Sequence, residues 1–286
     1  MLNSLLLHNK DSDLHVYLIY DNVDSEQLGL AASHLHQVLP GFSLLQASSK
    51  PLEGLPFDGH ATIATYFRLL LPEILPAAVD KVLFIDSDAI VSSDLSPLWH
   101  LPLQGRALAA IAEHRVSCSD HGYAFGHYFN AGVMLVNLEK WRQSDLLRKG
   151  KVFAKNNPDR LRHWDQDVLN HVFEDDWLMI PDRWNACPHL FGLTGEYDYD
   201  KYLFTEAEQE AIHNPAIIHY AGPGKIKPWN ALCIHPLKDR YLEAKALTPW
   251  PELPLDNMPP PAWIVRYQEW LFKTKCLLRE RLKLDS

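Results

Sequence analysis

The stretch at residues 81–91, KVLFIDSDAIV, constrains the fold of this chain more than any other. Residues 82–85 form a short apolar run rich in β-forming types, which indicates a strand buried on both faces of a sheet. Asp86 and Asp88 follow where the strand ends, and open α/β sheets bind ligands at the carboxyl ends of their parallel strands. Because side chains alternate along an extended chain, we expect both carboxylates on one side, where they can share a divalent cation.

An Asp-Ser-Asp sequence by itself has two other interpretations. It can be a polar turn in which Asp86 caps the next element, and short motifs of this kind often occur by chance. It can also be the nucleophile motif of a haloacid-dehalogenase-like phosphatase, in which an aspartate likewise follows an apolar strand. Phosphatases of that class usually carry the motif near the start of the chain, whereas about 80 residues come first here.

Composition excludes several classes of protein. The chain has 286 residues, of which 47% are hydrophobic and 22% charged, as expected for a globular protein with a sizeable core. The net charge of −9 argues against general nucleic-acid binding. The four cysteines are far apart, so we predict neither a zinc site nor a disulfide framework, and a reducing cytoplasm fits. We also expect no signal peptide and no spanning helix, because no apolar run approaches the ~20 residues that cross a bilayer.

Apolar runs of strand length alternate with stretches of helical periodicity, which predicts an α/β domain with a mostly parallel sheet. We expect strands at residues 14–20, 42–47, 82–85, 107–112, 133–136 and 217–220. We expect helices at residues 2–9, 25–39, 62–71, 138–150 and 163–175.

Residues 236–286 differ in composition from the catalytic domain expected at residues 1–235. Six prolines between positions 249 and 261 break up any regular element. Residues 263–284 then have a helical pattern that mixes aromatic with basic side chains, which is typical of a segment that lies on an anionic membrane. A C-terminal helix docked on the catalytic domain is an equal alternative.

Polar residues mark two further strand or helix ends. Asn130 precedes the strand at 133–136, although a structural Asn in a turn would give the same pattern. Asp165, Gln166 and Asp167 open the helix at 163–175. Asp165 alone can be an N-cap, but a cap does not account for three polar residues in a row.

A histidine and a glycine-rich loop follow the last expected strand. His219 ends the strand at 217–220, and the loop after it carries Gly222, Gly224, Lys225 and Lys227. A lone His is most often a satisfied core residue. Beside this loop, it fits a metal ligand next to a phosphate cradle.

Four motifs, FIDSD, FNAGVMLVN, WDQDVLN and HYAGPGKIKPW, together resemble glycosyltransferase family 8 in type and order. That family comprises retaining enzymes with the GT-A fold, which is Rossmann-like and has helices on both sides of its sheet. The proline-rich, aromatic and basic tail is similar to that of lipopolysaccharide-core glucosyl- and galactosyltransferases. A phosphatase explains none of the last three motifs and becomes a remote alternative.

The resemblance implies roles for individual residues. Mn2+ or Mg2+ would be held by Asp86, Asp88 and His219. Residues implied at the donor sugar and the reaction centre are Arg68, Asn130, Asp165, Gln166 and Asp167. Residues implied in binding the donor diphosphate are His60, Asp86, Ser87, Asp88, Gly222 and one of Lys225 and Lys227. Lys225 keeps the family's spacing from His219 and is slightly favoured, whereas Lys227 keeps the Lys-Pro-Trp context.

The implied activity is transfer of a hexose from UDP-glucose or UDP-galactose to a lipopolysaccharide core, with retention of configuration. Gln166 would lie on the β-face of the anomeric carbon, and its amide is a weak nucleophile, so we prefer front-face attack to double displacement through Asp167. The enzyme is expected in the cytoplasm, on the inner face of the cytoplasmic membrane. A catalytically impaired member that only binds nucleotide sugars or glycans is the main alternative.

The resemblance also implies an absence. Family members usually open with a strand and a uridine-binding loop, and a helix follows. Residues 1–9 already have the pattern of that helix, so we expect the first strand to be missing from this sequence. Its neighbours in the sheet would then have unpaired edges, and uridine recognition would be weakened.

Overall fold

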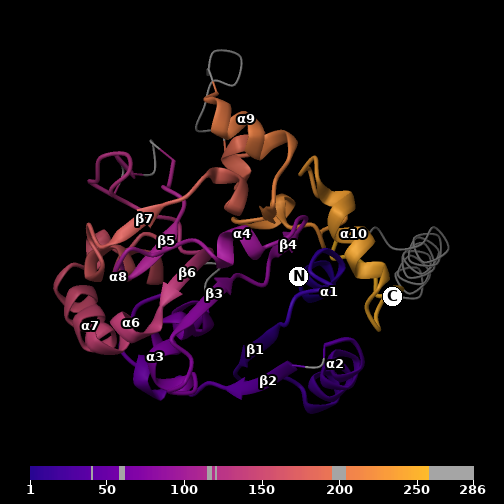
Figure 1. Ribbon diagram of the computed structural model, residues 1–286, viewed down its shortest axis with the longest axis horizontal. Coiled ribbons are helices and arrows are strands. Elements are labelled where there is room, and N and C mark those ends of the chain that lie inside the picture. The colour runs from indigo at the N-terminus through magenta and orange to yellow at the C-terminus, as the bar shows by residue number, and fades with distance from the viewer. Residues whose placement is uncertain (40, 58–61, 115–117, 120, 195–203, 258–286) are drawn as a thin grey trace, which may run out of the picture.

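The computed structural model describes the whole chain except residues 40, 58–61, 115–117, 120, 195–203 and 258–286. It is an α/β fold with strands in the middle and helices around them (Figure 1). The strands are β1 (His15–Tyr20), β2 (Gly41–Gln46), β3 (Lys81–Ile85), β4 (Ala89–Val91), β5 (Leu108–Ala110), β6 (Val133–Asn137), β7 (Trp177–Met179) and β8 (Ile217–His219). The α-helices are α1 (Leu2–His8), α2 (Ser25–Val38), α3 (Leu71–Ile74), α4 (Ser96–Trp99), α6 (Leu138–Gln143), α7 (Leu146–Asn156), α8 (Asp165–Val172), α9 (Glu206–His213) and α10 (Lys238–Ala246). The 3-10 helices are η1 (Lys50–Leu52), η2 (Ile63–Leu70), η3 (Pro158–Arg160), η4 (Asp182–Asn185), η5 (Pro188–Phe191) and η6 (Gly224–Ile226).

The central sheet has the strand order β3-β6-β5-β7. β6 runs antiparallel to both of its neighbours, and β5 pairs in parallel with β7. Three of the four strands therefore share one direction and β6 opposes them. This corrects one expectation, because β3 was predicted as a parallel-paired strand and its described partner, β6, is antiparallel. A separate antiparallel pair, β4 with β8, lies beyond the end of β3.

The parallel pair β1–β2 is separate from the central sheet. Among the described residues, β1 pairs only with β2, and β3 pairs only with β6. A cavity of about 1480 Å³ is lined by every residue of both β1 and β3 and by part of α1. All five residues of β3 are consequently half-buried, which differs from the strand buried on both faces that we predicted.

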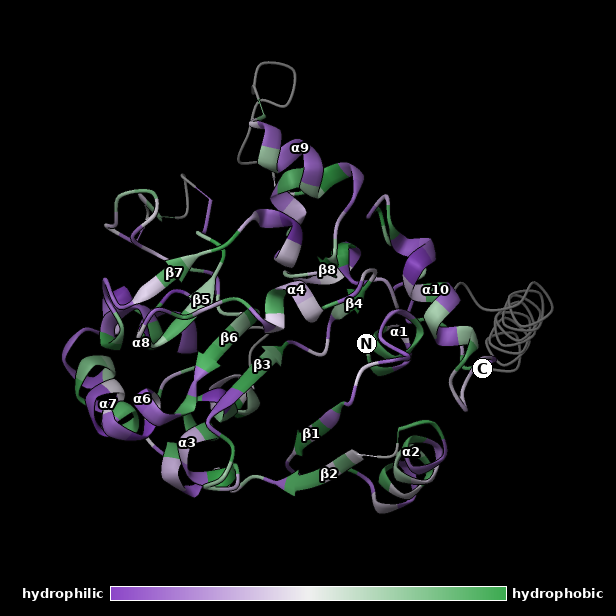
Figure 2. Ribbon diagram, viewed as in Figure 1, coloured by the Kyte–Doolittle hydropathy of each residue, from purple (hydrophilic) through white to green (hydrophobic). Residues whose placement is uncertain are grey.

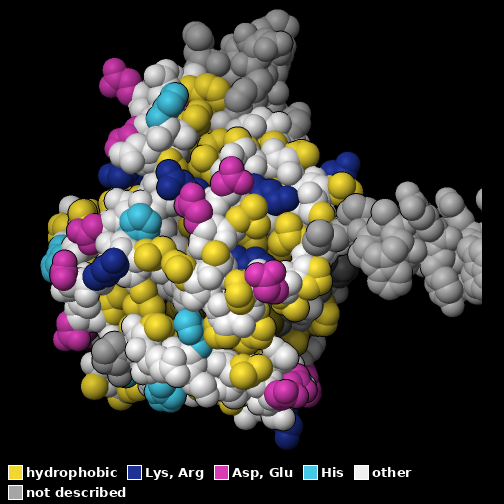
Figure 3. Space-filling view, turned by 90° about the vertical axis from the view of Figure 1, so that its right-hand side faces the viewer, with side chains coloured by type: hydrophobic (Ala, Val, Ile, Leu, Met, Phe, Trp, Pro, Cys, Tyr) yellow, Lys and Arg dark blue, Asp and Glu magenta, His cyan; other side chains and the backbone are white. Residues whose placement is uncertain are grey.

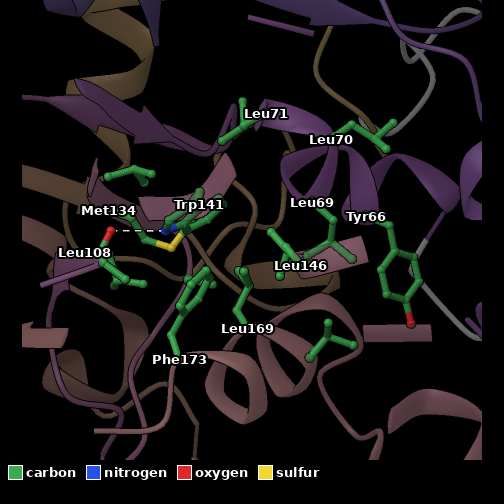
Figure 4. Close-up of a cluster of buried hydrophobic side chains, with 14 of the residues drawn as sticks. Tyr66, Leu69, Leu70, Leu71, Leu108, Met134, Trp141, Leu146, Leu169 and Phe173 are labelled. Atoms are coloured by element: carbon green, nitrogen blue, oxygen red, sulfur yellow. Dashed lines mark hydrogen bonds between the residues drawn. The ribbon is translucent and has the colours of Figure 1, made fainter. Parts of the chain in front are cut away.

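The main core lies between the central sheet and the helices α3, α6, α7 and α8. The strands β3, β5 and β6 are mostly hydrophobic, which Figure 2 shows in green. In Figure 4, Trp141 of α6 lies among Leu108, Met134 and Phe173, and its Nε1 donates to the carbonyl of Ala107 at 3.0 Å. This packing fixes the position of α8, whose first turn carries polar residues toward the ends of β3 and β6.

Several boundaries differ from the predicted ones. The helix expected at 138–150 is two helices, α6 and α7, because Asp145 has a left-handed backbone with φ of 56°. The helix expected at 62–71 is mostly the 3-10 helix η2. β4, β7, α9 and α10 were not predicted. Of the extension at 236–286, α10 packs through Tyr241 and Ala244 on a small core with β4 and β8, whereas the helix expected at 263–284 lies outside the described residues.

No helix in the described part of the chain is long and apolar enough to span a membrane. Cys118, Cys187 and Cys233 are free thiols.

Candidate active site

Asp86, Asp88 and His219 lie together at the end of the central sheet. Each offers one ligand atom, and these atoms all lie within 4.8 Å of one another. His219 Nε2 is 3.3 Å from Asp88 Oδ1 and 3.8 Å from Asp86 Oδ2. The structure therefore brings the three predicted metal ligands together in one cluster.

Asp86 and Asp88 face the same side because they lie in a turn, and not because side chains alternate along a strand. The amide of Ala89 donates to the carbonyl of Asp86 at 3.2 Å, which closes a tight turn between β3 and β4. β4 then pairs with β8 so that Ala89 lies opposite His219. The pairing brings His219, more than a hundred residues later in the chain, to the turn that carries the aspartates.

Gly132 allows His219 to occupy this position. A Cβ at residue 132 would lie 2.1 Å from Cε1 of the imidazole and 2.6 Å from its Nδ1. Gly132 also accepts a hydrogen bond from the Asp86 amide at 2.8 Å. The FNAG motif thus leaves room for the histidine and holds the start of the aspartate turn.

Burial and neighbouring charges shift the pKa values of all three residues of the cluster. Burial raises the pKa of Asp86 to about 6, against the opposing positive charges of Arg68 and His219. Burial would also raise the pKa of Asp88, but His219 and Lys227 outweigh it and the pKa falls below its usual value. For His219, burial is outweighed by the charge of Asp88, and its pKa is raised. Two carboxylate oxygens and one imidazole nitrogen are a donor set that fits Mn2+ or Mg2+.

Arg68 joins three segments of the site. Its Nη2 lies 2.7 Å from Asp86 Oδ1, and its Nε lies 2.8 Å from Asp165 Oδ2. Its Nη1 donates to the carbonyl of Ala131. The buried guanidinium therefore ties the end of β3, the start of β6 and the first turn of α8 to one another.

The three polar residues at the start of α8 have different surroundings. Asp165 is the first residue of the helix, not its N-cap, and its carboxylate also accepts a hydrogen bond from Thr65 Oγ1. Gln166 Oε1 accepts from the amide of Ala131 at 2.9 Å. Asp167 is 3% exposed and accepts hydrogen bonds from Tyr128 Oη and the His163 amide. Both oxygens of Asp167 are thus engaged in holding neighbouring segments.

The two lysines of the glycine-rich loop point differently. Lys227 forms an ion pair with Asp88 Oδ2 and donates to the carbonyl of Tyr220 at 3.0 Å. Lys225 is exposed on the turn η6. The geometry therefore favours Lys227 over Lys225 as the lysine that binds the donor diphosphate. The spacing in the sequence had slightly favoured Lys225. Gly222, with φ of 94°, and Ser87 are exposed, and His60 lies outside the described residues.

Two residues of the site were missed from sequence. The buried Glu113 carboxylate accepts from Asn130 Nδ2 at 2.9 Å and from Gln166 Nε2 at 3.1 Å. Burial opposes ionisation of Glu113, but neighbouring His189 and the hydrogen bond from Asn130 lower its pKa. Asn185 of η4 lies 2.8 Å from Asn130 and 2.9 Å from His219. An acidic residue directly after the apolar strand at 107–112 was a usable signal for Glu113, whereas the sequence around Asn185 has none.

Residues 1–233 match the family model described as glycosyl transferase family 8. The chain belongs to this family. The phosphatase interpretation is thereby excluded.

Several characterised relatives cover most of the chain. General stress protein A of Bacillus subtilis is 30% identical over 219 residues, which are 72% of this chain and 73% of that protein. A lipopolysaccharide 1,2-glucosyltransferase of Escherichia coli K12 is 27% identical over 257 residues, covering 87% of this chain and 73% of its own. The structure is similar to that of the galactosyltransferase LgtC, solved with donor and acceptor sugar analogues, with a TM-score of 0.75, 26% identity and 92% of each chain covered. These likenesses confirm the GT-A-like fold.

Proposed function

We propose that this family 8 glycosyltransferase moves glucose or galactose from a UDP-sugar to a lipopolysaccharide-core acceptor, with retention of configuration and with a divalent metal. The observation that carries the proposal is the cluster of Asp86, Asp88 and His219, flanked by two cations, Arg68 and Lys227. A metal and two basic side chains in one place suit a diphosphate leaving group. Names of relatives that act on lipopolysaccharide support the acceptor class.

In this proposal the chain's own residues divide the work. Asp86, Asp88 and His219 hold Mn2+ or Mg2+, which supplies positive charge to the departing diphosphate. Lys227 leaves Asp88 to contact the same diphosphate. Because Arg68 and Asp165 are already fixed against each other, they present hydrogen-bonding groups to the donor sugar with little loss of conformational freedom.

Gln166 is the residue proposed beside the anomeric carbon. Its amide is held by Ala131 and Glu113, so it presents a fixed dipole and not a reactive nucleophile. Asp167 is the carboxylate considered as the nucleophile of a double displacement, and its oxygens already accept hydrogen bonds from Tyr128 and His163. These contacts support front-face attack, in which the acceptor hydroxyl approaches from the side that UDP leaves.

We further propose that the enzyme works in the cytoplasm, at the inner face of the cytoplasmic membrane, through the tail from about residue 259. The support is the aromatic and basic composition of residues 263–284. On the described face that carries α1 and α10, Lys and Arg side chains lie beside Asp and Glu and do not gather in one basic patch (Figure 3). The tail is therefore the segment to which we assign membrane contact.

A catalytically impaired, ligand-binding family member is the second candidate. It is favoured by the separation of β1–β2 from the central sheet and by the cavity between β1 and β3. A UDP-sugar hydrolysis assay with Mn2+ distinguishes the candidates. Metal-dependent release of UDP from UDP-glucose or UDP-galactose supports the enzyme, whereas binding without release supports the impaired member.

A further inference from the structure

The imidazole of His219 is held on its far side by a chain of buried amides. His219 Nδ1 lies 2.9 Å from Asn185 Oδ1. Asn185 Nδ2 donates to Asn130 Oδ1 at 2.8 Å, and Asn130 Nδ2 donates to Glu113 at 2.9 Å. Asn185 is completely buried. A continuous set of hydrogen bonds therefore runs from Glu113 to the candidate metal ligand.

The direction of this chain is fixed at Asn130. The backbone N–H of Gly132 can only donate, and it reaches Asn130 Oδ1 at 2.9 Å. The Glu113 carboxylate, kept ionised by its neighbours, can only accept from the other end of the same amide. Asn130 consequently has one allowed orientation, with its nitrogen toward Glu113 and its oxygen toward Gly132.

The orientation of Asn130 determines that of Asn185 and then the tautomer of His219. Asn130 Oδ1 is an acceptor, so Asn185 must turn its nitrogen to it. Its own oxygen then faces His219 Nδ1, which must carry a proton to complete the hydrogen bond. Cys187 Sγ also lies near Nδ1, at 3.8 Å, but sulfur is a weaker acceptor.

We propose that Asn185 is a positioning residue that keeps His219 in the Nδ1–H tautomer, so that the Nε2 lone pair faces Asp86 and Asp88 as a metal ligand. The proposal rests on the metal site assigned under the proposed function and adds residues that do not touch the metal. Histidines that bind metals usually donate their other N–H to a fixed acceptor, and loss of that acceptor commonly lowers metal affinity by ~10–100-fold. η4 supplies the acceptor because the residue that follows it, Ala186, is hydrogen-bonded to β8: the amide of His219 donates to the Ala186 carbonyl at 3.0 Å.

The first test needs no substitution. In the full chain labelled with 15N-histidine and saturated with Mg2+, NMR reports which imidazole nitrogen of His219 is protonated. We expect a proton on Nδ1 and none on Nε2. A proton on Nε2, with Nδ1 bare, would overturn the proposal whatever any variant does.

The second test compares three variants by the Mn2+ affinity of the folded full chain, measured by electron paramagnetic resonance of free Mn2+. Asn185→Leu removes the acceptor and should weaken binding by ~10–100-fold. Asn185→Asp keeps an acceptor for Nδ1–H but cannot donate to Asn130 Oδ1, so it should lose clearly less affinity than Asn185→Leu. Cys187→Ala, which removes the nearby sulfur, is the matched control and should bind normally.

Two results of the variant test would refute the positioning role. One is unchanged Mn2+ affinity in folded Asn185→Leu, and the other is an equal loss in Asn185→Asp and Asn185→Leu. If the unsubstituted chain transfers sugar with Mn2+ and the variants give either of these results, only the role of Asn185 is refuted. If the unsubstituted chain neither binds Mn2+ nor releases UDP from a UDP-sugar, the proposed function fails as well.

Discussion

Replacement of Gly132 by alanine tests whether the glycine of the FNAG motif exists to admit His219. The new Cβ would lie 2.1 Å from His219 Cε1, whereas non-bonded carbon atoms need about 3.5 Å. The imidazole must therefore move by more than about 1 Å. It cannot do so freely, because it is 4% exposed and packed against Asn185 and Cys187.

Gly132→Ala should affect metal binding, the rate of UDP release and the stability of the fold, each to a different extent. A displaced His219 leaves Asp86 and Asp88 as a two-residue site, so Mn2+ affinity should fall by at least ~10-fold. A 1 Å misplacement in the site should lower the rate of UDP release by ~100-fold. Crowding in the core should lower the free energy of unfolding by about 1–3 kcal/mol.

The assays are Mn2+ binding, UDP release from UDP-sugars and urea unfolding, each on the same preparation. Gly29→Ala is the matched control, because a Cβ there meets nothing within 4 Å and residue 29 lies inside α2. It should leave metal binding unchanged and stabilise the helix by up to about 1 kcal/mol. Folded Gly132→Ala with normal Mn2+ affinity would show that His219 is not a ligand or that its position is not set by this glycine.

Three further outcomes are expected. Lys227→Met should weaken binding of UDP with Mg2+ by about tenfold or more, because a charge-assisted hydrogen bond contributes about 1.5–3 kcal/mol. Lys225→Met should leave UDP binding unchanged, and equal losses of affinity in both variants by isothermal titration would contradict this. Burial lowers the pKa of His235 from 6.5 to about 4, so the unfolded chain binds more protons in that range and stability falls as the pH drops. Between pH 7 and pH 5 this part of the fall in urea unfolding should be about 2 kcal/mol, and His235→Leu should remove it; an unaltered difference would refute the assignment. Deletion from Pro259 should reduce binding to anionic vesicles in sedimentation assays, as should high salt, and equal binding would leave the tail a structural role.

The fold was predictable where hydrophobic pattern alone decides it. The apolar runs that became β1, β3, β6 and β8 end at or just before a polar residue, and their bounds were located within one or two positions. β4 and β7 have three residues each and were not predicted. The break between α6 and α7 depends on the left-handed backbone at Asp145, which the helical pattern around it does not indicate.

Asp86 and Asp88 were predicted as a pair because they follow an apolar strand, and His219 was a candidate ligand because it ends another. The resemblance to family 8 then implied that the three residues share one site. The two lysines were not separable from sequence, since their directions depend on the loop in which Gly222 and Gly224 have positive φ and return Lys227 toward Tyr220.

The buried network around His219 was beyond sequence analysis for a different reason. Asn185 meets Asn130 across 55 positions of the chain and His219 across 34. Its η4 segment has no strand or helix pattern that places it. Only the packing of η4 against β8 brings its side chain to the imidazole.

We assign metal-dependent hexose transfer from a UDP-sugar to the cluster of Asp86, Asp88 and His219. The most direct measurement incubates the 286-residue chain with UDP-glucose or UDP-galactose and truncated lipopolysaccharide cores, and reads the products by mass spectrometry. With Mn2+ we expect one of the two donors to add a single hexose, no product with a chelator, and a loss of roughly a thousandfold or more in rate for folded Asp88→Asn. Transfer that persists in Asp88→Asn with Mn2+, or no transfer from either donor with any core, would contradict the account.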